Sequence, residues 1–330
     1  MMRAVVIDHP GEPEVLQLRT VPVPSPKPGW VLVRVLAFGL NRSELHFRQG
    51  VASTGSFPRI PGIEATGVVA AAPGGEFESG AQVVTMMGGM GRLFDGGYAE
   101  FVTVPASQVI PFRSELPWST LGAVPEMLQT AYGSLEVGLQ ALDGQSLLIR
   151  GGTSSIGMAI AVLAKLRDMT VLATTRKPEN AASLERLGVD HVIIDDGTIA
   201  PGVRRVAPAG VDGAVELVGV NVMHDTLRAV RAGGTVCFTG MLSDQWTIPD
   251  FYPMDWLPNG VRLTAYSGEA ADLPAQVLQE FLDAVANGDA VVPLGRTYRL
   301  DDIVQAHRDL EANAVRGKAV VVVDPRDRPG

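Results

Sequence analysis

Cysteine is nearly absent from this sequence, which contains one, Cys237, among 330 residues. A single cysteine cannot form a disulfide within one chain, and it cannot supply a cysteine-rich zinc-binding lobe. Cys237 lies in an apolar pattern that is typical of a strand, so we expect it to be a small, buried hydrophobic residue.

Long apolar runs and an excess of basic residues are also missing. No stretch of about 18 apolar residues occurs, so no transmembrane helix and no membrane partner are predicted. Residues 1–9 resemble a strand and lack the basic and apolar regions of a signal peptide, which favours a cytoplasmic location. The formal net charge of -9 argues against nucleic acid as a partner, because a surface that binds nucleic acid is usually basic.

The pattern of predicted elements changes near residue 119 and again near residue 270. Residues 1–118 contain short strand patterns separated by glycine- and proline-rich turns, which is typical of a barrel-like β domain. Residues 119–269 alternate helix and strand patterns and predict a doubly wound parallel sheet. Residues 270–330 return to strand patterns and are expected to complete the first domain, so the fold class is α/β with a discontinuous β domain. The strands of the parallel sheet are expected at residues 147–150, 170–175, 191–194, 213–218, 235–239 and 262–266.

A glycine-rich turn connects the first of these strands to a helix. The apolar run 147–149 precedes a turn of small residues, 151–155, and a helical pattern begins at Ile156. Backbone N–H groups at such a helix start can bind a pyrophosphate, although an ordinary strand-to-helix turn has a similar sequence. Ser154 takes the middle position of the G-x-G-x-x-G pattern, where its hydroxyl could donate to a phosphate. The expected phosphate contacts are Gly152, Thr153, Ser154, Ser155 and Ile156.

The end of the second strand distinguishes NADH from NADPH. Enzymes that use NADH usually have an acidic residue there, about 20 residues after the turn, which binds the ribose 2′-OH. This sequence has Thr175, Arg176 and Lys177 instead, and two cations attract a 2′-phosphate. We therefore predict NADPH, with the alternative that both cations are only solvated. Asp195 and Asp196 follow the third strand, and Asp196 opposes this prediction, because an acid near a 2′-phosphate is unfavourable.

Several separated motifs together resemble one protein family. They are residues 39–44 (GLNRSE), 60–67 (IPGIEATG), 96–101 (GGYAEF), 130–132 (TAY), 151–157 (GGTSSIG), 233–235 (GGT), 306–311 (AHRDLE) and 317–318 (GK). In this order they are similar to the medium-chain dehydrogenase/reductase family, in its zinc-independent quinone oxidoreductase branch. The resemblance implies a GroES-like β domain split around a Rossmann domain, with the active site in the cleft. Relatives dimerise by pairing their sixth strands, so a homodimer through residues 262–266 is expected.

The zinc dehydrogenases of this family bind their catalytic metal through residues that are missing here. Their cysteine would lie near Leu40, and their histidine corresponds to Ile63, which precedes Glu64. We therefore expect no metal, and we expect Glu64 to be a buried, paired acid. Without zinc as a Lewis acid, reduction of a quinone or an activated C=C bond is easier than alcohol oxidation.

The resemblance also assigns roles to single residues. Asn41 is expected beside the nicotinamide ribose and the substrate, with an Asx-turn as the alternative. His46 stands where relatives often have a substrate-cleft tyrosine, so it either donates to an enolate oxygen or is an exposed helix residue. Thr130 is expected to contact the nicotinamide mononucleotide half or to cap a helix. The turns after the fourth and fifth strands are expected to bind the nicotinamide carboxamide through Val218, Thr239, Gly240 and Met241.

Together these features predict an oxidoreductase that transfers hydride from NADPH to a quinone or to the activated C=C bond of an α,β-unsaturated carbonyl. Two alternatives stay open. One is a trans-2-enoyl thioester reductase, which would usually have a tyrosine proton donor where His46 stands. The other is a redox sensor that binds NADPH without useful turnover.

Overall fold

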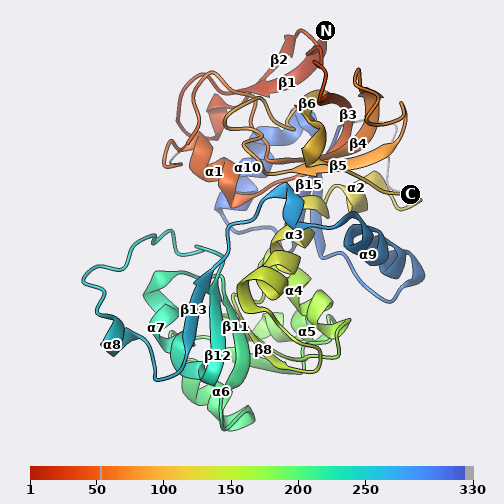
Figure 1. The fold of residues 1–330 in the computed structure, drawn as a ribbon. Helices are drawn as coiled ribbons and strands as arrows, with labels where there is room; N and C mark the ends of the chain where they lie inside the picture. Colours follow the sequence, from red (N-terminus) through yellow and green to blue (C-terminus); the bar gives the residue numbers. More distant parts are fainter. Residues whose placement is uncertain (53, 324–330) are drawn as a thin grey trace. The chain divides into compact units, whose positions relative to one another are not determined.

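The computed structural model describes residues 1–52 and 54–323, which form two compact units (Figure 1). The β unit consists of Met1–Gln129 and the described part of Glu269–Gly330. The α/β unit is Thr130–Gly268. Among the helices of the described residues, none has the length and apolar character needed to cross a membrane.

A mixed sheet of seven strands forms the body of the β unit. Its order is β14-β15-β3-β4-β5-β7, and β6 also pairs with β3. Strand β15, from the end of the chain, pairs antiparallel with β3, so the tail completes this unit as the sequence predicts. The strands are β3 Trp30–Gly39, β4 Glu64–Ala71, β5 Gln82–Met86, β6 Phe101–Pro105, β7 Val109–Pro111, β14 Leu294–Arg299 and β15 Lys318–Val322, with β1 Met2–Val6 and β2 Gln17–Val21 in a separate pair. The main helices are α1 Arg42–Arg48, α2 Trp118–Leu121, α9 Ala275–Asn287 and α10 Ile303–Glu311.

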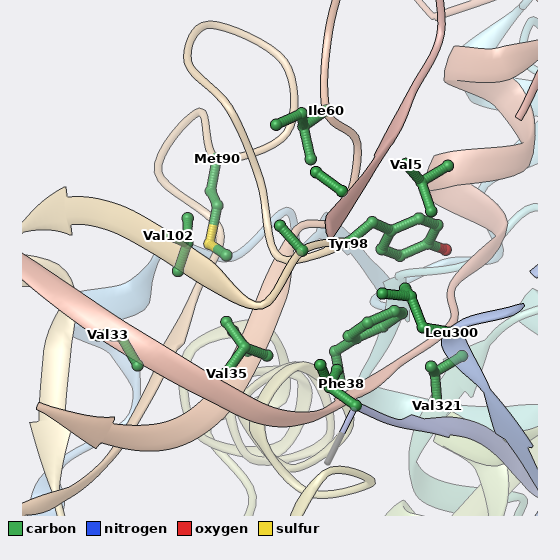
Figure 2. Packing of buried hydrophobic residues seen from close by; sticks show 14 of the residues in the cluster. Val5, Val33, Val35, Phe38, Ile60, Met90, Tyr98, Val102, Leu300 and Val321 are labelled. Carbon is green, nitrogen blue, oxygen red and sulfur yellow. The ribbon is translucent and has the colours of Figure 1, made fainter. Parts of the chain in front are cut away.

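The core of the β unit is built from alternating residues of its strands. Val33 and Val35 of β3 point to the same face and are buried, as the period of two in a strand requires. The ring of Phe38 stacks on the ring of Tyr98 (Figure 2), and their centroids are 4.5 Å apart. The Tyr98 hydroxyl lies 3.1 Å from Nε2 of His307, which gives both buried polar groups a hydrogen bond.

The boundary between the units differs from the predicted one. Helix α2 packs against β3, β4 and β15, and therefore belongs to the β unit. The side-chain amide of Gln129 donates to the carbonyl of Glu269 (3.0 Å), which joins the two chain segments of that unit. The α/β unit thus begins at Thr130, within helix α3 (Pro125–Gly133), rather than at residue 119. Packing of a short helix onto distant strands leaves no local signal in the sequence.

The α/β unit is a doubly wound parallel sheet, as predicted. Its order is β10-β9-β8-β11-β12-β13, which reverses direction between β8 and β11. Leu147, Leu148 and Ile149 of β8 are fully buried, as expected for a central parallel strand covered on both faces. Ligands of such sheets bind at the carboxyl ends of the strands near this reversal. The strands are β8 Ser146–Arg150, β9 Thr170–Thr175, β10 His191–Ile194, β11 Val211–Glu216, β12 Val230–Phe238 and β13 Arg262–Ala265, and the main helices are α4 Ser155–Lys165, α5 Ala181–Glu185, α6 Ala200–Val206 and α7 Val220–Ala229.

Candidate functional site

The turn between β8 and α4 has glycines where any side chain would clash. A Cβ on Gly157 would lie 2.5 Å from the carbonyl oxygen of Gly151, and one on Gly152 would lie 2.8 Å from Cβ of Ala173. Gly151 also has a φ of +88°, which side chains rarely tolerate. These glycines allow α4 to start close against the sheet, so its N-terminus faces the carboxyl ends of the strands.

Three backbone donors remain available at this helix start. The N–H groups of Thr153, Ser155 and Ile156 have no acceptor among the described residues. Unpaired N–H groups and the helix dipole together favour an anion. The turn therefore fits a pyrophosphate.

Two of the predicted phosphate contacts have other partners. The Ser154 hydroxyl donates to the carbonyl of Gly151 (2.8 Å) and accepts from the N–H of Gly157 (3.0 Å), so it caps α4. The prediction that this hydroxyl donates to a phosphate is therefore wrong for this structure. The N–H of Gly152 is also occupied, because it donates to the carbonyl of Thr174 (3.1 Å).

The carboxyl end of β9 presents two exposed cations. Arg176 and Lys177 form no ion pair with any described residue. The buried Thr175 shapes this turn, because its hydroxyl accepts from the N–H of Lys177 (3.2 Å). The two cations are thus available to an anionic ligand.

The acidic residues after β10 do not neutralise these cations. Asp195 forms a bidentate ion pair with Arg150, with both N–O distances at 2.9 Å. Asp196 is exposed and accepts from the N–H of Thr198 (3.1 Å). Of these two acids, Asp196 is therefore the one whose carboxylate could oppose a nearby phosphate.

A buried carboxyl organises the turn after β11. Oε1 of Glu216 accepts from the N–H groups of Val218 (2.7 Å) and Gly219 (3.1 Å), and Oε2 accepts from the hydroxyl of Thr226. Burial raises the pKa of Glu216 to about 7. The N–H of Val218 is thus already paired, contrary to the prediction that it binds a carboxamide.

The turn after β12 presents more free hydrogen-bond acceptors than free donors. The N–H groups of Thr239 and Gly240 both donate to the backbone carbonyl of Glu216, at 3.0 and 3.1 Å. Their carbonyl oxygens and the N–H of Met241 have no partner among the described residues. A nicotinamide carboxamide could therefore meet two acceptors and one donor here.

Glu216 predicts a pH dependence of stability. Its pKa is raised from the ordinary value of 4.5 to about 7, so folding takes up a proton between these values. The stabilisation is complete below pH 4.5 and is lost as the pH rises through 7. The unfolding free energy of wild type should fall by about 2 to 3 kcal/mol more than that of Glu216→Gln between about pH 5 and 8. Urea denaturation measures this, and a pH-independent difference would contradict it.

Thr130 lies in the interior of α3, so the helix-capping interpretation is wrong. The element begins at Pro125, and the carbonyl of Thr130 accepts from the hydroxyl of Ser134 (2.7 Å). The Ser134 hydroxyl also lies 3.0 Å from Oγ1 of Thr239. Within the α/β unit, Thr130 is thus connected to the turn after β12.

Asn41 is the centre of a buried polar network in the β unit. It precedes α1, and its N–H donates to Oε2 of Glu44 (2.9 Å). Its side-chain nitrogen donates to Oε1 of Glu64 (2.9 Å), and its side-chain oxygen accepts from the ammonium of Lys318. Asn41 is also the N-cap residue of α1 and forms a capping box with Glu44, so its side chain combines this local role with contacts to distant residues.

Lys318 balances the acids of this network. Its ammonium lies 2.9 Å from Glu64 and 3.0 Å from Glu126. Both carboxylates raise the pKa of Lys318, so it stays charged although it is buried. Burial raises the pKa of Glu64, and it raises that of Glu44 to about 7. The prediction that Glu64 is a buried, paired acid is confirmed.

The β unit has no ligand set for zinc within the described residues. No group of three His, Cys, Asp or Glu side chains there could hold a metal ion. Ile63, at the position of the family's histidine ligand, is buried and apolar. His46 is half-buried in the last turn of α1.

Sequence analysis did not identify Arg150, Glu216 or Lys318 as parts of these sites. Arg150 is a charged residue that ends an otherwise apolar strand, immediately before the glycine turn. That local break in the pattern was the one available signal. For Lys318, the motif was recognised, but its partner Asn41 is 277 residues away.

Comparison with known proteins identifies the family. Residues 27–114 match the family described as alcohol dehydrogenase GroES-like domain, and residues 187–321 match zinc-binding dehydrogenase. The quinone oxidoreductase of Lama guanicoe is 29% identical, with 98% of each chain aligned. Two solved structures at 26% identity cover 98% of this chain and 100% of theirs: an NAD-dependent alcohol dehydrogenase (TM-score 0.87) and mycobacterial Rv1454c complexed with NADPH (TM-score 0.85).

The chain belongs to the medium-chain dehydrogenase/reductase family, with a GroES-like domain and a Rossmann-like parallel sheet. It is an oxidoreductase. The support for this is its similarity to proteins named quinone oxidoreductase, which extends over 98% of the chain. The two structural neighbours name different nicotinamide cofactors. The choice between the cofactors therefore has to be argued from this chain's own residues.

Proposed function

We propose that this protein is a zinc-independent reductase that uses NADPH to reduce quinones or the activated C=C bond of α,β-unsaturated carbonyls. The observation that carries the proposal is the pair of unpaired cations, Arg176 and Lys177, beside a glycine turn with free N–H groups. The family and the relatives named quinone oxidoreductase support the reaction class. Bound NADPH would supply the hydride.

Each part of the cofactor has a proposed partner. The N–H groups of the α4 start bind the pyrophosphate, and the two cations bind the 2′-phosphate. The carbonyls after β12 and the N–H of Met241 bind the carboxamide. Asn41 lies beside the nicotinamide ribose. Hydride addition to an enone leaves negative charge on an enolate oxygen, which His46 is proposed to stabilise by donating a hydrogen bond.

Steady-state oxidation of NADPH tests the function. The panel contains a quinone, a short enone and an enoyl thioester, with NADH in parallel. We expect turnover with the quinone or the enone and a strong preference for NADPH. Turnover with the thioester alone would favour the enoyl thioester reductase, and cofactor binding without any turnover would favour the redox sensor.

His46 is tested by a single substitution. We expect His46→Phe to lower kcat by roughly 100-fold with little change in KM for NADPH, because a hydrogen-bond donor to the transition state is lost. His9→Phe is the control, because His9 is an exposed histidine of the same unit. An unchanged kcat in His46→Phe would remove His46 from the mechanism.

We also propose a homodimer through the edge strand β13. Within the described residues β13 pairs with β12 alone, which leaves its other edge open. Light scattering should give the mass of two chains, and the mass of one chain would reject the proposal. The cytoplasmic location expected from the sequence stays a prediction.

A further inference from the structure

Arg150 is a buried arginine at the carboxyl end of β8, directly before the glycine turn. Its side chain is fully buried and donates in two directions. Nε and Nη2 bind the two carboxylate oxygens of Asp195, each at 2.9 Å. Nη1 binds Asp225 (2.9 Å) and Thr226 (3.0 Å), which belong to α7.

Asp195 is placed next to the exposed cations by the register of the sheet. Ile194 of β10 is the partner of Thr175 in β9, and the N–H of Asp195 donates to the carbonyl of Thr175 (2.8 Å). Asp195 and Arg176 therefore follow neighbouring strands at the same edge. The Asp195 side chain is nevertheless only 8% exposed, because it points to Arg150.

Without Arg150, the carboxylate of Asp195 would have two unfavourable effects on a phosphate ligand. It could pair with Arg176, which would then be lost to the ligand. It would also repel a 2′-phosphate directly, because two negative charges a few ångströms apart interact strongly at a partly buried site.

We infer that Arg150 determines cofactor specificity as a positioning residue: it holds Asp195 away from the adenosine ribose and so keeps Arg176 and Lys177 free for the 2′-phosphate. The inference rests on the proposed use of NADPH and adds a residue that does not itself touch the cofactor. It also explains how this chain can carry an acid after β10 and still prefer NADPH.

The other hydrogen bonds of the acids that bind Arg150 should allow the protein to fold when Arg150 is replaced. Asp225 also accepts from the N–H groups of Ile199 (2.7 Å) and Ala200 (3.3 Å) at the start of α6. Asp195 accepts from the N–H of Gly197 (2.9 Å). Both acids thus keep hydrogen bonds in Arg150→Met.

Calorimetry with cofactor fragments tests the inference on the full chain. Adenosine 2′,5′-bisphosphate carries the 2′-phosphate and 5′-AMP lacks it, so the ratio of their Kd values isolates recognition of that group. We expect wild type to favour the bisphosphate and Arg150→Met to lose at least about tenfold of this preference, a change of 1.4 kcal/mol, with 5′-AMP binding nearly unchanged. Arg150→Met/Asp195→Asn should regain the preference, because the carboxylate at position 195 is removed as well.

The other outcomes distinguish a failure of the role of Arg150 from a failure of the proposed use of NADPH. A full preference in Arg150→Met, or no recovery in the double variant, would overturn the role of Arg150. Arg204→Met is the control for loss of a cation, because Arg204 binds only backbone carbonyls, and it should keep the preference. If Arg150→Met does not fold, Asp195→Glu takes its place, because the longer side chain breaks the bidentate pair and should lower the preference equally. Equal binding of both fragments by wild type would instead refute the use of NADPH.

Discussion

Replacing Arg176 and Lys177 by alanine should weaken NADPH binding on the order of 100-fold and leave NADH binding within about twofold. A hydrogen bond to a charged group contributes roughly 1.5 to 3 kcal/mol, and each 1.4 kcal/mol is a factor of ten in Kd. Both side chains are exposed and form no ion pair among the described residues, so their charge is fully available to a 2′-phosphate. NADH lacks that phosphate, and its binding should be insensitive to the change.

Fluorescence titration of both cofactors measures this effect. The matched control is Arg186→Ala, which removes an exposed cation at the end of α5 in the same unit. Added salt should weaken NADPH binding in wild type more than in the double variant, because exposed charges are screened. Equal losses for NADH and NADPH would show that the cations act on the fold, and no loss for either would show that they are only solvated.

The strands of the α/β unit could be predicted because their signal is local. β8 contains a short apolar run and β9 is rich in β-branched residues, and both ends of β9 match the prediction. The glycine turn was equally accessible, because small residues between an apolar run and a helical pattern are a local signal, although Gly152 is required by Ala173 of the neighbouring strand. The start of the α/β unit was not predicted correctly, because the unit to which α2 belongs depends on the strands that this helix packs against.

The hydrogen-bonding state of the site residues could not be predicted from the sequence. Arg150 meets Asp195 across 45 residues and Asp225 across 75, and no spacing rule connects such positions. The same limit explains the corrected carboxamide contacts. Whether the N–H of Thr239 is free depends on a carbonyl of the neighbouring strand, which only the register of β11 and β12 determines. A sequence therefore identifies the turns that surround a ligand better than the atoms that remain to bind it.

Replacing Lys318 by methionine should have the largest effect on stability. The ammonium of Lys318 lies 2.9 Å from Glu64, whose carboxylate is fully buried. Removing one partner of a buried ion pair leaves an uncompensated charge and typically costs about 3 to 5 kcal/mol. The midpoint of the first unfolding transition should therefore move to a lower urea concentration than in wild type. Because the pKa of Lys318 is raised, its ammonium stays charged throughout the neutral range, and the stability that it contributes is lost only when the pH rises through that raised value.

Two further variants distinguish a buried ion pair from a solvent-exposed ion pair. Lys165→Met removes an ammonium that is 2.8 Å from Asp190, but both side chains are about one-third exposed. It should cost no more than about 1 kcal/mol, because exposed ion pairs contribute little. Lys318→Met/Glu64→Gln should recover part of the stability, since the uncompensated carboxylate is removed as well. Equal small losses of stability in Lys318→Met and Lys165→Met would contradict the prediction. They would mean that water reaches the network around Asn41 and that the charges of this network do not fix the position of the Asn41 amide.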